Sequence, residues 1–142
     1  MENFDYLPKL HNCQLIIANE IKRLCDKHNI KYFIVAGTLL GAIRHGGFIP
    51  WDDDIDVAIP RHEYNKFVKL ASQKSIAENI SLVCLENNNN YYLPFAKLYN
   101  NKTVLKEHHI DTDFELGIYI DIFPLDGLTD NKFLRKIQFT EV

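Results

Sequence analysis

The chain has 142 residues, a length that fits one folded domain with one core. Apolar residues make up 46% of the chain and charged residues 25%, ordinary globular values that exclude extensive disorder. The net charge of -3 excludes the broad basic surface of a nucleic-acid-binding protein, but it leaves room for a local basic pocket that binds a nucleotide or phosphate. We therefore expect a single domain over residues 1–142 that binds no nucleic acid.

Cysteine content and terminal composition predict the compartment. Cys13, Cys25 and Cys84 are odd in number and lack the spacing of a metal knuckle, so we expect free, mostly buried thiols in a cytosolic protein. The acidic N-terminus has no basic stretch followed by an apolar core, so we expect no signal peptide. No apolar run approaches the roughly 20 residues that cross a bilayer, which predicts no transmembrane segment. We expect a cytoplasmic protein, either dissolved or peripheral to the inner face of the membrane.

Apolar periodicity divides the chain into helices and strands. In chain order it predicts a helix over 8–29, a buried strand over 32–36, a helix over 38–45, a strand over 54–59, a helix over 61–74, a strand over 80–85, a hairpin that 95–99 and 103–106 could form, a strand over 117–123, and a helix from a cap at Asp130 to about 139. This order predicts an α+β domain with helices packed on a mixed, partly antiparallel sheet.

Four aspartates fall within five residues where the 54–59 strand is expected to begin: Asp52, Asp53, Asp54 and Asp56. Carboxylates this close raise one another's pKa unless solvent or a cation relieves the repulsion. A solvated turn is the ordinary explanation of such a run. The strand pattern favours another, because Asp54 and Asp56 would share one face while the apolar residues between and after them enter the core. Two carboxylates so placed can share one hard cation such as Mg²⁺.

Asp121 is a lone acid in the apolar strand over 117–123, and a buried charge needs a partner. A salt bridge to a lysine or arginine is one solution. If this strand lies beside the 54–59 strand, Asp121 instead becomes a third metal ligand. Gly37 and Thr38, between a strand and a helix, would let the backbone approach a phosphate and offer it N–H donors, although one Gly-Thr pair is usually only a turn.

Three longer segments carry a resemblance. Residues 36–61 read AGTLLGAIRHGGFIPWDDDIDVAIPR, residues 119–126 read YIDIFPLD, and Pro94 to Thr103 lies between them. Together they closely resemble the LicD family, which includes bacterial phosphocholine transferases and fukutin-type ribitol-phosphate transferases. The Gly-Thr turn, the Asp-x-Asp strand and the later single Asp also resemble the nucleotidyltransferase superfamily that includes DNA polymerase beta. The resemblance implies a nucleotidyltransferase (DNA polymerase beta-like) fold.

The resemblance also implies an activity and a site. Such enzymes move a phospho-substituted alcohol, such as phosphocholine, from a CDP-linked donor to a sugar hydroxyl of a glycan or lipid-linked acceptor, as in lipopolysaccharide or teichoic acid modification. By position in the motifs, the catalytic and Mg²⁺- or Mn²⁺-binding residues would be Asp54, Asp56 and Asp121, and the donor-binding residues Gly37, Thr38, Arg44 and Lys97. Surface solubility is the alternative role for Arg44 and Lys97. Asp52 would support the metal ligands from beside them.

Two other functions use the same residues. A nucleotidyltransferase would add a nucleoside monophosphate to a small molecule or protein with the same acids. An inactive, truncated nucleotide-binding domain is the third reading, because members of this family commonly continue well beyond the second acidic block. The sequence resembles a family member shortened at its C-terminus.

Overall fold

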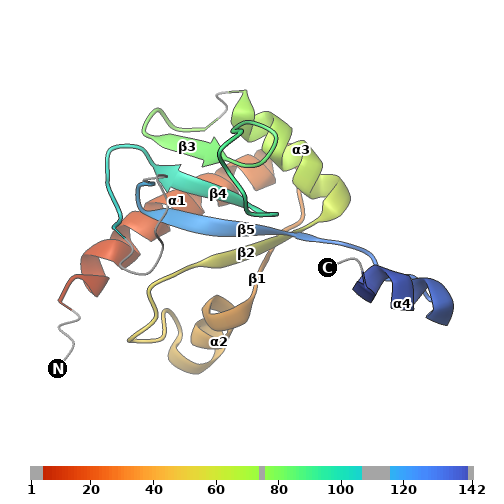
Figure 1. Cartoon of the computed structure of the whole chain (residues 1–142). Coiled ribbons are helices and arrows are strands. Elements are labelled where there is room, and N and C mark those ends of the chain that lie inside the picture. The colour runs from red at the N-terminus through yellow and green to blue at the C-terminus, as the bar shows by residue number, and fades with distance from the viewer. Residues whose placement is uncertain (1–4, 74–75, 107–115, 141–142) are drawn as a thin grey trace.

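The computed structural model describes residues 5–73, 76–106 and 116–140. Its elements, shown in Figure 1, are α1 (Leu7–His28), β1 (Phe33–Ile34), α2 (Ala36–His45), β2 (Asp56–Pro60), α3 (Arg61–Ser72), β3 (Ile80–Val83), β4 (Ala96–Asn100), β5 (Tyr119–Leu125) and α4 (Lys132–Thr140). No helix in these ranges has both the length and the apolar character needed to cross a membrane.

The strands form one sheet in the order β1-β2-β5-β4-β3. β2 and β5 run parallel, and every other neighbouring pair is antiparallel, so the predicted α+β domain with a mixed sheet is confirmed. β5 lies at the centre. Because side chains alternate along a strand, β5 buries Ile120 and Ile122 on one face and directs Tyr119, Asp121 and Phe123 to the other.

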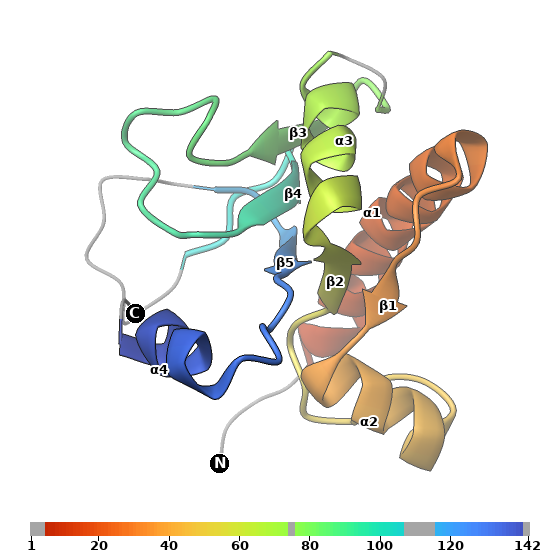
Figure 2. The ribbon, with the colours of Figure 1, turned by 90° about the vertical axis from the view of Figure 1, so that its right-hand side faces the viewer.

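The helices α1 and α3 cover one face of the sheet, and the loop of residues 84–95 lies on the other (Figure 2). A single cluster of buried apolar side chains joins both helices to β2, β3, β4 and β5. In α1 the buried positions include Ile17, Ile21 and Leu24, the helical spacing seen in the sequence. The core therefore fills one side of the sheet, and the charged residues of the central strands face the opposite side.

A strand forms within the predicted segment 32–36, but the predictions of its length and its burial are wrong. β1 contains only Phe33 and Ile34, which are 52% and 37% exposed. It pairs with β2 alone and is an edge strand, outside the cluster that α1 and α3 bury. A short apolar run has the same pattern in both settings, so the sequence could not separate an edge strand from a buried one. The chain then enters α2 at Ala36, which has a φ of +49°.

The predicted hairpin of 95–99 with 103–106 is also wrong. β4 pairs with β3 on one side and β5 on the other, while Leu105 forms an isolated bridge with Leu116. The two flanking strands satisfy the backbone of β4 on both edges, which leaves no edge for a hairpin partner. The turn after β4 instead contacts the approach to β5, because the Thr103 hydroxyl donates to the Asn100 carbonyl and accepts from the Ile118 N–H.

Several element ends differ from the prediction. β2 begins at Asp56 rather than at residue 54, and α2 begins two residues before Thr38. Asn131, not Asp130, caps α4, since its side-chain oxygen accepts from the N–H groups of Phe133 and Leu134. The end of the predicted 61–74 helix falls partly outside the described residues. The three cysteines are free and two of them are buried, as predicted.

Candidate active site

Side chains of α1 hold the loop before β2, which contains Asp52, Asp53 and Asp54, by hydrogen bonds. His11 Nε2 donates to the carbonyl oxygen of Asp52 at 2.7 Å, and Gln14 Nε2 donates to that of Asp53 at 2.8 Å. The His11 ring also stacks on Phe48, with ring centroids 3.7 Å apart. These contacts fix the backbone of the acidic loop through its carbonyl groups, so the carboxylates of the loop remain available for other contacts.

Sequence reasoning missed His11 and Gln14. Gln14 is a polar residue on the apolar face of α1, between Leu10 and Ile17, and all three are buried. A polar side chain at such a position needs a hydrogen-bond partner, which is the signal that could have drawn attention to it. His11 carries no comparable signal, since a half-exposed histidine on a helix is common.

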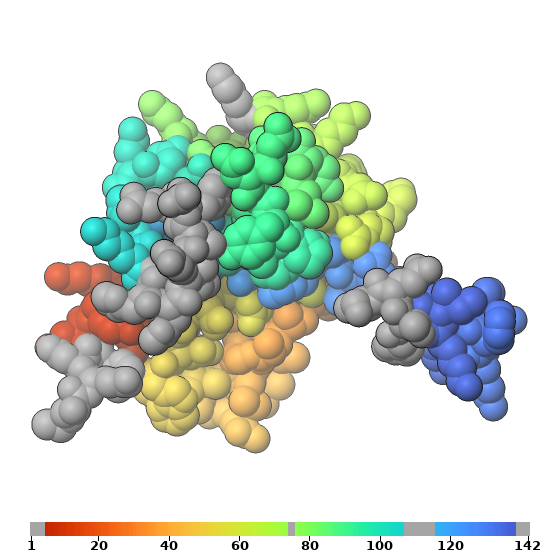
Figure 3. Space-filling model, viewed as in Figure 1, coloured from red at the N-terminus to blue at the C-terminus, as the bar shows by residue number. Residues whose placement is uncertain are grey.

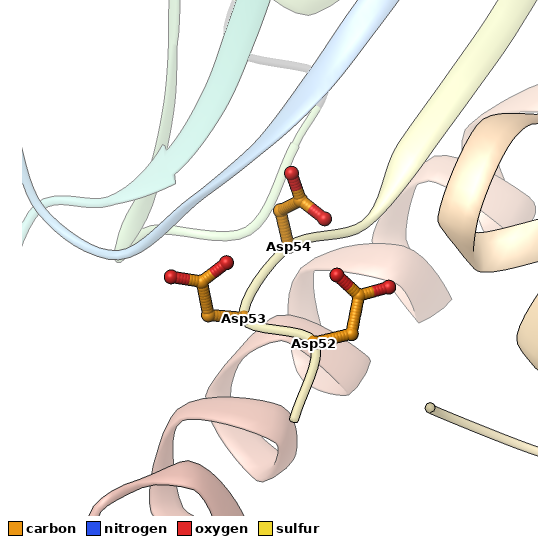
Figure 4. A group of neighbouring side chains, drawn as sticks. All are labelled: Asp52, Asp53 and Asp54. Atoms are coloured by element: carbon orange, nitrogen blue, oxygen red, sulfur yellow. The ribbon is translucent and has the colours of Figure 1, made fainter. Parts of the chain in front are cut away.

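Three carboxylates converge at this loop. Oxygen atoms of Asp52, Asp53 and Asp54 all lie within 4.8 Å of one another, and Figure 4 shows the side chains projecting from one short stretch of chain. Burial, together with the neighbouring Asp56 and Asp52 carboxylates, raises the pKa of Asp54 to about 7. Burial and the Asp121 carboxylate likewise raise the pKa of Asp56. Burial and mutual repulsion therefore make it costly to ionise these carboxylates together.

The strands that carry Asp56 and Asp121 are neighbours, which is the condition under which Asp121 could be a third metal ligand. The two residues are Cα partners in the parallel β2–β5 pair, and the Asp121 N–H donates to the Ile55 carbonyl at 3.2 Å. Asp54 lies in the loop just before β2, which begins at Asp56. The structure thus places Asp56 beside Asp121, while the carboxylate of Asp54 meets those of Asp52 and Asp53.

The salt bridge that the sequence offered as the other role of Asp121 is present. Lys97 Nζ donates to Asp121 Oδ1 at 2.5 Å across the β4–β5 pair. Lys97 is only 7% exposed, so its alternative role as a surface solubility residue is wrong. Its ammonium lies over the Tyr119 ring, with Nζ 3.5 Å from that centroid and 5.5 Å from the centroid of Phe95.

Gly37 and Thr38 lie in the first turn of α2 rather than in a separate turn, and both contact the acidic segment. The Thr38 hydroxyl accepts from the Asp56 N–H at 2.8 Å and so fixes the start of β2. A Cβ at Gly37 would lie 2.6 Å from Asp52 Oδ2, so only glycine fits there without moving that carboxylate. The structure therefore shows these two residues positioning the acids.

Arg44 lies in the last turn of α2 and is exposed. No hydrogen bond or salt bridge between described residues joins it to the acids. Its neighbour His45 packs edge-on against Trp51, with ring centroids 6.3 Å apart. Of the predicted donor-binding residues, the structure thus brings Gly37, Thr38 and Lys97 to the acids and leaves Arg44 on the surface.

Figure 3 shows the face of the molecule on which the loop that joins β3 to β4 lies. Residues of β5, in light blue, reach the surface below the green loop that joins β3 to β4, and the yellow residues around β2 lie beside them. On this side of the sheet lie the carboxylates of Asp56 and Asp121, the buried Lys97 and the rings beside it, whereas the other side is covered by α1 and α3. The arrangement is suited to a polar ligand that carries phosphate and a cation.

Comparison with known proteins agrees with this arrangement. The family described as LicD/FKTN/FKRP, nucleotidyltransferase domain, matches residues 29–138. Over 115 residues the chain is 36% identical to the lipopolysaccharide cholinephosphotransferase LicD of Haemophilus influenzae, which covers 80% of this chain and 42% of that protein. Over 135 residues it is 54% identical to an uncharacterized protein of Rickettsia prowazekii, which covers 89% of this chain and 46% of that protein.

A shorter match is to a human protein. Over 42 residues the chain is 53% identical to the human ribitol 5-phosphate transferase FKRP, which covers 30% of this chain and 8% of that protein. The chain spans less than half the length of the curated relatives it matches. The family match contains α2, β2, β5 and all the acids described above. The chain belongs to the LicD family.

Proposed function

We propose that this domain carries out metal-dependent transfer of a phospho-substituted alcohol, such as phosphocholine, from a CDP-linked donor to a sugar hydroxyl of a cell-surface glycan precursor. One observation carries the proposal. Asp56 and Asp121 lie side by side on two parallel strands, with the half-buried Asp52 and Asp54 next to them, in a chain of the LicD family. A carboxylate cluster of this kind is the usual protein contribution to metal-assisted phosphoryl transfer.

The donor set fits a hard divalent cation. All the candidate ligands are carboxylate oxygens, which Mg²⁺ and Mn²⁺ prefer. Burial and the neighbouring carboxylates together raise the pKa of Asp54, and a bound cation would relieve the repulsion among these acids. Asp54, Asp56 and Asp121 would hold the ion, and Asp52 would support them. When bound, such an ion neutralises charge on the phosphate oxygens of the donor.

The chain's own residues would keep this cluster in place. Thr38 fixes the backbone of Asp56, and the absence of a side chain at Gly37 gives the Asp52 carboxylate its room. His11 and Gln14 hold the carbonyl groups of the acidic loop. Positioning of this kind matters because displacement of a ligand by about 1 Å can cost a hundredfold in rate.

The names of two relatives favour a phospho-alcohol as the transferred group. One is a cholinephosphotransferase of lipopolysaccharide and the other a ribitol 5-phosphate transferase. The family description favours the runner-up, a nucleotidyltransferase that adds a nucleoside monophosphate with the same acids. The two reactions differ in which part of the CDP-linked donor reaches the acceptor.

Product analysis tests the proposal directly. The chain would be incubated with CDP-choline, Mg²⁺ and a lipid-linked glycan extract, and the acceptor examined by mass spectrometry. Acceptor that gains phosphocholine, with release of CMP, supports the proposal, and acceptor that gains CMP supports the runner-up. Binding of CDP-choline without any product supports an inactive nucleotide-binding domain. Full activity in Asp54→Asn or Asp56→Asn would overturn the assignment of the acids.

A further inference from the structure

Lys97 is a buried cation within the acidic face of the sheet. Its side chain is 9% exposed, and that of Asp121, its partner in the salt bridge, is 15% exposed. The two residues are directly opposite in the antiparallel β4–β5 pair, which places the ammonium on the same face as Asp56. The other salt bridges between described residues join Lys22, Arg23 and Arg61 to acids elsewhere.

The positive charge of Lys97 acts on more than one of the acids. It opposes the effect of burial on the pKa of Asp56, while it contacts Asp121 directly. A divalent cation bound by Asp56 and Asp121 would thus lie close to an ammonium ion already in contact with one of its ligands. A divalent cation and an ammonium ion that share one carboxylate repel each other strongly, and this repulsion is stronger in a buried site than in bulk water.

Two aromatic rings offer the ammonium a position that does not depend on Asp121. Lys97 Nζ lies 3.5 Å from the centroid of Tyr119 and 5.5 Å from that of Phe95. Phe95 is itself held against Phe123, with ring centroids 4.4 Å apart. The faces of aromatic rings attract cations, so the ammonium would remain on this face of the sheet after losing its contact with the carboxylate.

We propose that Lys97 is the resident counter-ion of Asp121, which a divalent cation displaces, so that the lysine and the metal compete for one carboxylate. The released ammonium, kept nearby by Tyr119, then contacts the diphosphate of the donor. This inference rests on the proposed function. The rival interpretation is that Lys97 permanently supports Asp121 as a ligand, and the two interpretations predict opposite effects of removing the lysine.

Metal affinity without nucleotide separates the two interpretations. Lys97→Met removes the charge and keeps much of the side-chain volume, while Lys97→Gln removes the charge but can still donate a hydrogen bond to Asp121. Binding of Mn²⁺ and Mg²⁺ would be measured by titration calorimetry and by thermal shift. We expect roughly tenfold tighter metal binding in both variants, because one competing positive charge is gone. Lys22→Met, on the exposed face of α1, is the matched control for net charge.

The metal affinities of the Lys97 variants decide between competition and support. Unchanged or weaker metal binding in the Lys97 variants overturns it and favours the supporting role. If Lys97→Met does not fold without metal, Lys97→Gln carries the measurement. If the unaltered chain binds no divalent cation, the metal-dependent function fails as well. If it binds one that Asp54→Asn abolishes, while the Lys97 variants bind no more tightly, only this inference fails.

A kinetic measurement tests the second half of the proposal. With saturating Mg²⁺, loss of the ammonium should raise the KM for CDP-choline about tenfold or more, with a smaller effect on kcat, and Lys97→Arg should restore part of the KM. A lysine that only supports Asp121 would lower kcat and leave KM nearly unchanged. Such a result would exclude contact between Lys97 and the donor.

Discussion

The two ends of the parallel β2–β5 pair carry acids in opposite electrostatic states. Beyond the carboxyl end, Asp126 receives two hydrogen bonds from Arg61, from Nε and Nη2, both at 2.6 Å. This contact holds the pKa of Asp126 below its usual value. At the amino end, burial and neighbouring carboxylates raise the pKa of Asp54 to about 7 and that of Asp56 above its usual value.

The difference separates a structural acid from a group suited to binding. Asp126 is paired with the Arg61 guanidinium, and this ion pair is exposed, so the pair adds little to stability. Its charge is already balanced without a bound ligand. At the other end Asp121 contacts Lys97, Asp56 lies beside Asp121, and Asp54 meets Asp52 in the preceding loop. Folding gains nothing from such crowding, and perturbed groups of this kind gather at functional sites. The following predictions test this comparison.

The largest effect is expected on activity. Asp54→Asn and Asp56→Asn should each lower the rate of transfer by about a thousandfold or more, since each removes a ligand of the ion that stabilises charge in phosphoryl transfer. Product formation from CDP-choline would be measured alongside circular dichroism. The matched control is Asp26→Asn on the exposed face of α1, which should keep near-normal activity. Equal losses in all three variants would contradict the comparison.

The next effect is expected on stability without metal. Lys97→Met should lower the free energy of unfolding by about 3–5 kcal/mol, because it leaves the buried Asp121 carboxylate without this cation. Arg61→Met, at the exposed pair, should cost only about 0–1 kcal/mol. Urea denaturation would measure both. The double variant Lys97→Met/Asp121→Asn should recover most of the loss, and a double variant less stable than Lys97→Met would argue against the pair.

A smaller effect is expected from the residue that fixes the start of β2. Thr38→Val keeps the shape of the side chain but loses the hydrogen bond from the Asp56 N–H, which should cost about 1 kcal/mol of stability. Activity should fall more than stability suggests, because the Asp56 backbone loses its anchor. Thermal melts and transfer assays would be compared, with Thr38→Ser as the variant that retains the hydroxyl. Unchanged activity in Thr38→Val would remove this positioning role.

The smallest effect is expected in the dependence of stability on pH, because Asp54 is only half-buried and solvent screens its charge. An acid with a higher pKa in the folded than in the unfolded chain binds its proton more tightly when folded. With a folded pKa of about 7 against 3.8, Asp54 should therefore make the metal-free protein less stable as the pH rises from about 4 to 7. Asp126 acts in the opposite sense, since its lowered pKa adds stability that is lost as the pH falls below its usual value.

Melting temperatures measured in a chelator between pH 4 and pH 8 would show this decline. Asp54→Asn should flatten it, because the amide does not titrate. Saturating Mg²⁺ should do the same by compensating the carboxylate charge. A melting temperature that rises steadily from pH 5 to pH 7 in the metal-free protein would show that the amino-end acids are neutralised by some other means.

Local sequence determined much of the fold and the chemical content of the site. The amphipathic patterns of α1 and α3 and the apolar alternation of β5 were sufficient to predict these elements, because each pattern records which side faces the core. The Asp-x-Asp pattern and the lone Asp121 identified the acids. The longer motifs indicated the LicD family, which the comparisons confirm.

Only the tertiary structure decided how those acids are partnered. Asp121 meets Lys97, which is 24 residues away, and the acidic loop rests on His11 and Gln14, which are 41 and 39 residues away from their partners. The order of the sheet also left β1 at an exposed edge and placed β4 between two strands. The periodicity of a segment indicates which of its faces meets the core and which meets solvent. Strand pairing and side-chain contacts between distant segments depend instead on the order of the strands in the sheet, which no local sequence pattern contains.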